Sequence, residues 1–180
     1  MSARAGLATA PGIAAAAALS TLAACGGDAP ALRPVRVGDP APAYAAVSLE
    51  GDSVRLSDLD GPVVLNLWAT WCQPCREEMP ELQELAERYD GRLEVVGVSI
   101  DSRGSEPTVR NFLDQLGVGF RILHDPEQRF VSTFRTIGVP ETFLIDREGI
   151  VRARWTGPFH PLEPENVALF DEVLEAASGA

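Results

Sequence analysis

The sequence contains no lysine, and apart from two histidines its basic residues are all arginine. The 180 residues include 15 arginines against 26 aspartates and glutamates, which gives a formal net charge of −11. Such a chain is poorly suited to bind a phosphate backbone, because affinity for nucleic acids rests largely on positive charge. We therefore expect no nucleic-acid partner.

Cysteine is also scarce, with three residues in the whole chain. Three cysteines cannot form the disulfide framework that stabilises small secreted proteins. The length suits one domain of about 150 residues. An apolar fraction of 46% and a charged fraction of 23% are typical of a folded globular chain. Cys72 and Cys75 are three positions apart whereas Cys25 stands alone, so we expect the pair and the single cysteine to have different roles.

The N-terminal apolar run is too short to span a bilayer. Residues 13–24 supply only about half of the 20 apolar residues that a membrane helix needs, and the run is typical of an export signal. It ends in Leu-Ala-Ala-Cys at residues 22–25, which resembles the lipobox of bacterial lipoproteins, where cleavage precedes a lipid-bearing cysteine. We predict a lipoprotein signal peptide over residues 1–24 and lipid attachment at Cys25. A plain secretory peptide and an uncleaved anchor are the alternatives.

Residues 25–42 are rich in Gly, Ala and Pro and lack apolar periodicity. We therefore predict a flexible tether that leads to a folded domain over residues 43–180. The anchor would hold this domain on a bacterial membrane, facing the periplasm or another extracytoplasmic space. Cysteines there meet oxidising conditions.

Two nearly continuous apolar runs, residues 63–68 and 93–100, are typical of parallel strands that are covered on both faces. Between them, apolar residues recur at helical spacing from Met79 to Tyr89. The pattern therefore predicts a strand, a helix and a second strand joined by a right-handed crossover.

The remaining patterns predict an α/β fold with a mixed central sheet and helices on both faces. A glycine-ended turn at residues 146–149 indicates an antiparallel hairpin. The other expected elements are short helices over 109–116 and 130–134, strands over 120–123, 142–145 and 150–155, a C-terminal helix over 166–177, and an edge hairpin over 44–49 and 53–56.

Cys72 and Cys75 lie where the first central strand gives way to its helix, the edge at which α/β sheets bind ligands. A thiolate at a helix N-terminus is stabilised by the helix dipole and by free backbone N–H groups, which lower its pKa. We therefore expect Cys72 to be the attacking sulfur. Cys75, one turn further, can resolve the mixed disulfide and release the substrate as the Cys72–Cys75 disulfide closes.

Two other uses of this pair are open. A zinc site would need more ligands, but His124 and His160 are 36 positions apart, far from the spacing of a zinc finger. A static disulfide that closes so short a loop would contribute little stability. We expect no metal site, and we expect both histidines to be surface or loop residues.

Residues 68–80, Trp-Ala-Thr-Trp-Cys-Gln-Pro-Cys-Arg-Glu-Glu-Met-Pro, resemble the active-site signature of the thioredoxin-like TlpA/ResA/CcmG group of membrane-tethered thiol-disulfide oxidoreductases. Residues 138–146, Gly-Val-Pro-Glu-Thr-Phe-Leu-Ile-Asp, are similar to the cis-proline segment of that group. The resemblance covers residues 37–177. It implies a thioredoxin-like fold with an N-terminal hairpin extension and an insert over residues 112–134 after the second central strand.

The resemblance also bears on site residues. It implies a cis bond between Val139 and Pro140, which the local sequence alone would not, because only about 5–6% of X-Pro bonds are cis. Pro140 would face the Cys72 sulfur, and Trp71, Val139 and Pro140 would contact the substrate. We expect Trp68 and Trp71 to be one core residue and one lid over the sulfurs.

Asn66 stands where ordinary thioredoxins carry a buried acid that helps to move the proton of the second cysteine. The resembling group often has a neutral residue there and a recurring Glu three residues after the second cysteine, so proton handling would shift to Glu78. The i, i+3 spacing also places Glu78 near Cys75 on a helix. Alternatively, Glu78 is an exposed first-turn acid that the helix dipole favours.

The combined prediction is an exported, lipid-anchored thiol-disulfide oxidoreductase that acts as a reductant, as in cytochrome c maturation, and that needs no cofactor. Its partners would be protein thiols and disulfides, such as those of apocytochrome c or a copper-site protein, and a membrane protein that donates electrons. The reductant role rests on family analogy. The alternatives are a copper-delivery module and a thiol peroxidase, although a peroxidase needs Thr or Ser where this chain has Ala69.

Overall fold

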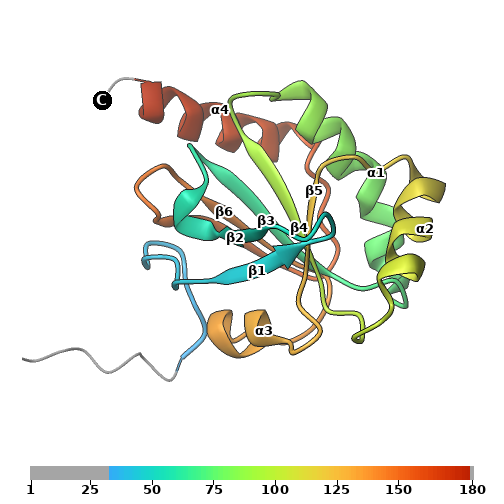
Figure 1. Cartoon of the computed structure of the whole chain (residues 1–180). Coiled ribbons are helices and arrows are strands. Elements are labelled where there is room, and N and C mark those ends of the chain that lie inside the picture. Colours follow the sequence, from blue (N-terminus) through green and yellow to red (C-terminus); the bar gives the residue numbers. More distant parts are fainter. Residues whose placement is uncertain (1–32, 179–180) are drawn as a thin grey trace, which may run out of the picture. The chain divides into compact units, whose positions relative to one another are not determined.

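A mixed sheet with the strand order β2-β1-β5-β4-β3-β6-β7 forms the centre of the folded unit (Figure 1). The computed structural model describes residues 33–178, so the predicted signal peptide over residues 1–24 and Cys25 lie outside it. Among residues 33–178, no helix is both long enough and apolar enough to cross a membrane. The elements are β1 (Ala45–Ser48), β2 (Ser53–Arg55), the 3-10 helix η1 (Leu56–Asp58), β3 (Val63–Trp68), α1 (Gln73–Arg88), β4 (Glu94–Ser99), α2 (Glu106–Leu116), β5 (Arg121–His124), α3 (Arg129–Phe134), β6 (Glu141–Ile145), β7 (Val151–Thr156) and α4 (Pro164–Ser178).

Strands β3 and β4 are parallel neighbours, as predicted, with Val63 paired to Glu94 and Trp68 paired to Ser99. The antiparallel strand β6 lies on the other side of β3. All six residues of β3 are buried, because the strand is central in the sheet and covered on both faces. Asn66 is the one hydrophilic residue of this strand, and its side chain belongs to the candidate active site.

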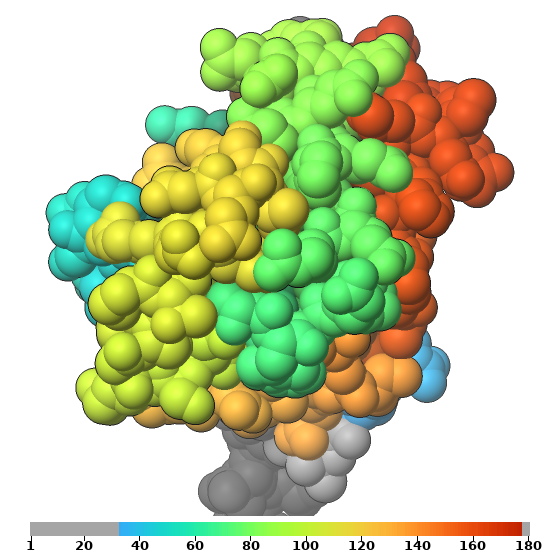
Figure 2. Space-filling model, turned by 90° about the vertical axis from the view of Figure 1, so that its right-hand side faces the viewer, coloured from blue at the N-terminus to red at the C-terminus, as the bar shows by residue number. Residues whose placement is uncertain are grey.

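Helices α1, α2 and α4 cover one face of the sheet and α3 covers the other (Figure 1). Figure 2 views the first of these faces, on which α1 lies between α2 and α4. There, Val64 of the sheet and Phe170 of α4 belong to one core cluster. On the opposite face, Phe130 and Phe134 of α3 stack at a centroid distance of 4.2 Å, and Tyr44 meets both rings edge-on. The predicted fold, with helices on both faces, is confirmed.

Two helices begin earlier than the apolar pattern predicted. Helix α2 begins at Glu106 and α4 at Pro164, each with a proline in its first turn. Proline suits this position, because the first N–H groups of a helix have no partner within it. The added residues, 106–108 and 164–165, include no buried apolar side chain, so they leave no mark on the hydrophobic periodicity.

The folded unit begins at Arg33, so the predicted tether over residues 25–42 is too long. Residues 33–42 lie against the sheet and α3. Val35 is buried, and its N–H donates to the carbonyl of Phe134 at 3.4 Å. The Gly38 N–H donates to a β7 carbonyl at 2.8 Å. Backbone contacts of this kind do not require an apolar pattern, which is why composition pointed to a tether.

Candidate active site

The two cysteines of the motif are joined by a disulfide at the N-terminus of α1. Cys72 is the N-cap of this helix, and its Sγ accepts the backbone N–H of Cys75 at 3.2 Å. Cys72 is 5% exposed and Cys75 is fully buried. Because the helix dipole and this N–H favour negative charge on the Cys72 sulfur, the geometry suits a nucleophilic first thiolate and a shielded second sulfur.

The bond between Val139 and Pro140 is cis, as the resemblance implied. Strand β6 begins at the next residue, where Glu141 pairs with Leu67 of β3. This register sets Pro140 at the carboxyl end of β3, the end from which the chain continues to the cysteines. The N–H and C=O of Val139 make no hydrogen bond to any residue between 33 and 178.

Two large apolar side chains beside these segments are exposed. Trp71 is 67% exposed, and Ile137, in the loop before the cis-proline, is 76% exposed. Trp68 is fully buried and stacks on Phe112 with ring centroids 5.2 Å apart, so the prediction that one tryptophan belongs to the core is confirmed. Sequence reasoning missed Ile137, because a single apolar residue in a loop belongs to no periodic pattern.

Glu78 lies on the buried side of α1, one turn after Cys75, and is 2% exposed. The alternative of an exposed first-turn acid is therefore wrong, because this turn of the helix faces the sheet. The carboxyl group accepts the side-chain N–H of Asn66 at 2.7 Å and the backbone N–H of Phe159 at 3.1 Å. Burial raises the pKa of Glu78 to about 7, although both hydrogen bonds act to lower it. A carboxyl group of this kind can gain or lose a proton near neutral pH.

Asn66 connects the Glu78 carboxyl to the neighbouring strand. The residue is fully buried, and its side-chain Nδ2 also donates to the hydroxyl of Thr142 at 2.9 Å. Thr142 is the register partner of Asn66 on β6, which explains why these side chains meet. Within the described part of the chain, Asn66 Oδ1 has no hydrogen-bond partner. Sequence reasoning missed Thr142, whose only signal was its place opposite Asn66 in the sheet.

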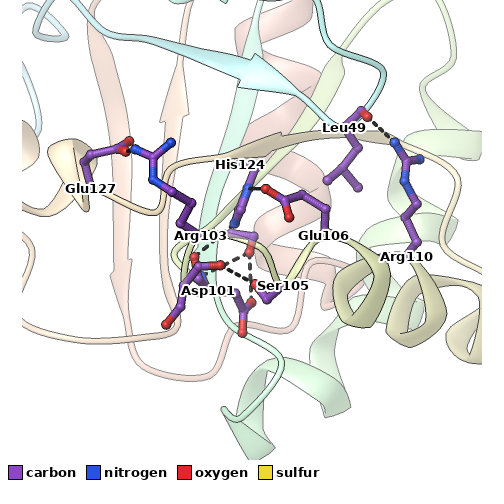
Figure 3. A network of polar contacts seen from close by, with 10 residues as sticks. Leu49, Asp101, Arg103, Ser105, Glu106, Arg110, His124 and Glu127 are labelled. Carbon is purple, nitrogen blue, oxygen red and sulfur yellow. Dashed lines mark hydrogen bonds and ion pairs between the residues drawn. The ribbon is translucent and has the colours of Figure 1, made fainter.

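A second polar network fixes the turn between β3 and the cysteines. The Asp101 carboxylate accepts the Thr70 N–H at 3.0 Å and the Thr70 hydroxyl at 2.6 Å. Behind it, His124 Nε2 lies 3.0 Å from the Asp101 carbonyl and Nδ1 lies 3.3 Å from the Glu106 carboxylate (Figure 3). His124 belongs to β5 and is 7% exposed, so the prediction of a surface or loop position is wrong. Both ring nitrogens have partners from other elements, which the sequence alone does not reveal.

The second histidine, His160, lies in an exposed loop, as predicted. The two histidines contact different carboxylates, Glu106 and Glu81. Between residues 33 and 178, no group of three or more His, Cys, Asp or Glu side chains is placed to hold a metal ion.

A disulfide at the start of a helix, a cis-proline at the same sheet edge and a thioredoxin-like sheet together define a thiol-disulfide oxidoreductase. The chain belongs to the AhpC/TSA family, whose model matches residues 37–154.

Comparison with known proteins leads to the same class. The thiol-disulfide oxidoreductase ResA of Bacillus anthracis is 36% identical over 119 residues, which are 65% of this chain and 68% of the relative. The thioredoxin-like protein YneN of Bacillus subtilis is 35% identical over 133 residues, 73% of this chain and 78% of the relative. A crystal structure provisionally assigned to the thiol:disulfide interchange protein DsbE of Chlorobium tepidum is 30% identical and superposes with a TM-score of 0.70, covering 78% of this chain and 99% of that one. The predicted fold and enzyme class are confirmed.

Proposed function

We propose that this oxidoreductase is exported, is anchored to a bacterial membrane by lipid on Cys25, and reduces disulfides in protein substrates. The Cys72 thiolate attacks the substrate disulfide and forms a mixed disulfide, releasing one substrate thiolate. Cys75 then attacks the Cys72 sulfur, so that the second substrate thiolate leaves and the Cys72–Cys75 disulfide closes. A membrane protein with a dithiol would return the two electrons and restore the reduced pair.

The buried Glu78 carboxyl is the observation that carries the reductant direction. A carboxylate one turn from Cys75 disfavours a second negative charge nearby, so it opposes thiolate formation. A pair whose thiolates are less stabilised gives up its electrons more readily, because a stabilised reduced form is what makes a strong oxidant. With its pKa raised to about 7, Glu78 can also exchange a proton with Cys75 during each half-reaction.

The exposed apolar residues support a polypeptide substrate. Trp71 and Ile137 flank the motif and the cis-proline, and the Val139 backbone has free hydrogen-bonding groups within the described chain. An extended substrate segment would pair with Val139 and place apolar side chains on Trp71 and Ile137. The oxidised cysteine pairs of apocytochrome c or of a copper-site protein would be substrates of this kind.

The redox state of the Cys72 and Cys75 pair in living cells tests the direction. Free thiols are trapped by acid quenching and alkylation, and the two forms are separated by the mass of the label. We expect mainly reduced thiols, which in an oxidising compartment imply a dedicated electron supply. A pair that is oxidised in every growth condition would overturn the reductant role.

Replacing Ile137 with serine should raise the KM for a disulfide-containing protein substrate such as insulin by about tenfold, because one exposed aliphatic side chain loses its contact with the substrate. The kcat should change little, since Ile137 is not one of the reacting groups. The measurement is steady-state insulin reduction beside the reduction of a small aromatic disulfide. Val47→Ser removes a similar side chain, 47% exposed on β1, and serves as the control. Equal KM values for Ile137→Ser and the control would contradict the proposal that the substrate binds against Ile137.

Changing Cys25 to serine should release the protein from the membrane fraction or block its processing, because serine cannot carry the thioether-linked lipid. The measurement is fractionation followed by mass analysis of the N-terminus. Cys25 is not part of the active-site pair, so insulin reduction by the variant should equal that of the parent. Unchanged membrane association of an unprocessed chain would favour the uncleaved anchor instead.

A further inference from the structure

The loop that joins β7 to α4, residues 157–163, is hydrogen-bonded both to the cis-proline and to helix α1. At its start, the Gly157 N–H donates to the carbonyl of Pro140 at 3.0 Å. Two residues later, the Phe159 N–H donates to Glu78 at 3.1 Å. This β7–α4 loop therefore binds the buried Glu78 carboxyl and also the carbonyl of Pro140, the proline of the cis bond.

The inner side of the β7–α4 loop is fixed by packing. The Phe159 ring is 1% exposed and lies 4.2 Å from the Trp155 ring, centroid to centroid. The carbonyl of His160 accepts the side-chain N–H of Asn166 at 2.8 Å. These contacts join the loop to β7 and to α4, but not to α1.

The outer side of the loop is tied to α1 by one ion pair. His160 Nδ1 lies 3.2 Å from the Glu81 carboxylate, and Glu81 is three residues after Glu78 on the same helix. In Figure 2, the orange-red segment that leads into α4 borders the green surface of α1. The loop thus contacts α1 at two levels, with the buried bond to Glu78 beneath and the solvent-facing pair to Glu81 above.

The titratable groups that act on the His160 ring are all acidic. The hydrogen bond and charge of Glu81 raise the pKa of His160, with smaller contributions in the same direction from Glu163 and Glu78, and against a lowering by partial burial. Glu81 and Glu78 belong to α1, and Glu163 belongs to the β7–α4 loop. His160 is therefore the positive partner of this cluster when it is protonated.

We propose that His160 is a positioning residue which, through its ion pair with Glu81, holds the β7–α4 loop closed over Glu78. Closure keeps the Phe159 N–H on the carboxyl and keeps water away from it. Burial is the main cause of the raised pKa of Glu78, so the closed loop maintains the property on which the proposed redox role of that residue rests.

The charge of His160 makes closure depend on pH. The ion pair contributes fully at low pH, and the contribution is lost as pH rises through the raised pKa of His160. The side chains are 56% and 35% exposed, and ion pairs so open to solvent are weak. We expect the ratio of open to closed loop to rise by about two- to fivefold across this transition.

Amide hydrogen exchange of the Phe159 N–H, measured on the oxidised full chain from pH 5 to 9 and corrected for intrinsic exchange, tests the proposal. Arginine at position 160 keeps its charge throughout, whereas glutamine never has one. Parent protein should therefore exchange like His160→Arg at low pH and like His160→Gln at high pH, with a two- to fivefold step between them. Glu81→Gln should remove the step, and adding it to His160→Gln should have no further effect.

Glu84→Gln is the matched control, because it removes an exposed acid from α1 that has no hydrogen bond or ion pair to the loop. It should leave the step in place. Superimposable profiles for the parent, His160→Arg and His160→Gln would overturn the proposal. The oxidised chain has no free active-site thiols, so this result does not depend on the reductant role. A pH step that persists while Glu78→Gln leaves the thiols unchanged would support loop closure and overturn only the proposed use of Glu78.

Discussion

Replacing Cys72 with serine should lower the rate of protein-disulfide reduction by about three orders of magnitude or more. The thiolate is the nucleophile in disulfide exchange, and a serine hydroxyl remains protonated and unreactive at neutral pH. Cys75 cannot take over, because its sulfur is fully buried behind Cys72 at the start of α1. The measurement is insulin reduction with dithiothreitol as electron source.

Cys75→Ser is the informative companion. This variant should still attack, but it should accumulate mixed disulfides between Cys72 and the substrate, visible as adducts on non-reducing gels. Cys25→Ser serves as the control for loss of a cysteine elsewhere and should reduce insulin at the parent rate. Preferential alkylation of Cys75 over Cys72 in the reduced protein at neutral pH would reverse the assigned roles.

Glu78→Gln should remove a pH dependence of stability that amounts to about 3 kcal/mol. The folded pKa of Glu78 is about 7 against an ordinary value of 4.5. Between these values the unfolded chain has lost this proton and the folded chain still holds it. The free energy of unfolding of the parent therefore falls as pH rises through this window, whereas the variant has no proton to lose there.

Denaturant unfolding of both proteins at pH values from 4 to 8 measures this difference. The stability of the variant relative to the parent should rise with pH and level off above about pH 7, where Glu78 is ionised in both states. Glu84→Gln removes an exposed acid from the same helix and should show no such trend. Parallel curves for the parent and Glu78→Gln would mean that Glu78 titrates like a solvated acid.

The same variant tests the effect of Glu78 on the cysteines. Without the carboxylate, the apparent pKa of Cys72 should fall and the protein should become a weaker reductant, because a stabilised thiolate stabilises the reduced form. The two shifts must occur together, since they report one interaction between coupled groups. Thiolate absorbance against pH and a redox titration with glutathione measure them. If both curves superimpose on those of the parent, proton transfer at Cys75 does not involve Glu78.

The central part of the fold was predictable because the sequence pattern within each segment agrees with the structure that the segment forms. The apolar run of β3 and the helical spacing from Met79 to Tyr89 each fix one element and the side that it buries. The cysteine motif falls between them, so its place at a helix start followed from the sequence. The cis bond before Pro140 followed from resemblance, because nothing local to Val139 requires it.

What the sequence did not reveal depends on contacts between distant segments. Thr142 meets Asn66 only because β6 pairs with β3, and Phe159 reaches Glu78 from a loop 81 positions further along the chain. The burial of His124 has the same origin, since its partners come from the ends of β4 and α2. Such contacts are set by register and packing, and periodicity within one segment carries no information about them.

Under the proposed lipid anchor, the packing of residues 33–42 would limit where the enzyme can work. With lipid on Cys25, as proposed, the tether that remains outside the folded unit is residues 26–32. Seven residues span at most about 25 Å when fully extended. The folded unit begins close to Val35, whose carbonyl accepts a hydrogen bond from the Arg154 side chain. Arg154 also forms an ion pair with Glu141, the residue after the cis-proline. Arg154 thus joins the start of the folded unit to the residue that follows the cis-proline. Under the proposed lipid anchor, a reductase held so close to the bilayer would serve disulfides presented at the membrane surface rather than those of proteins diffusing in the surrounding fluid.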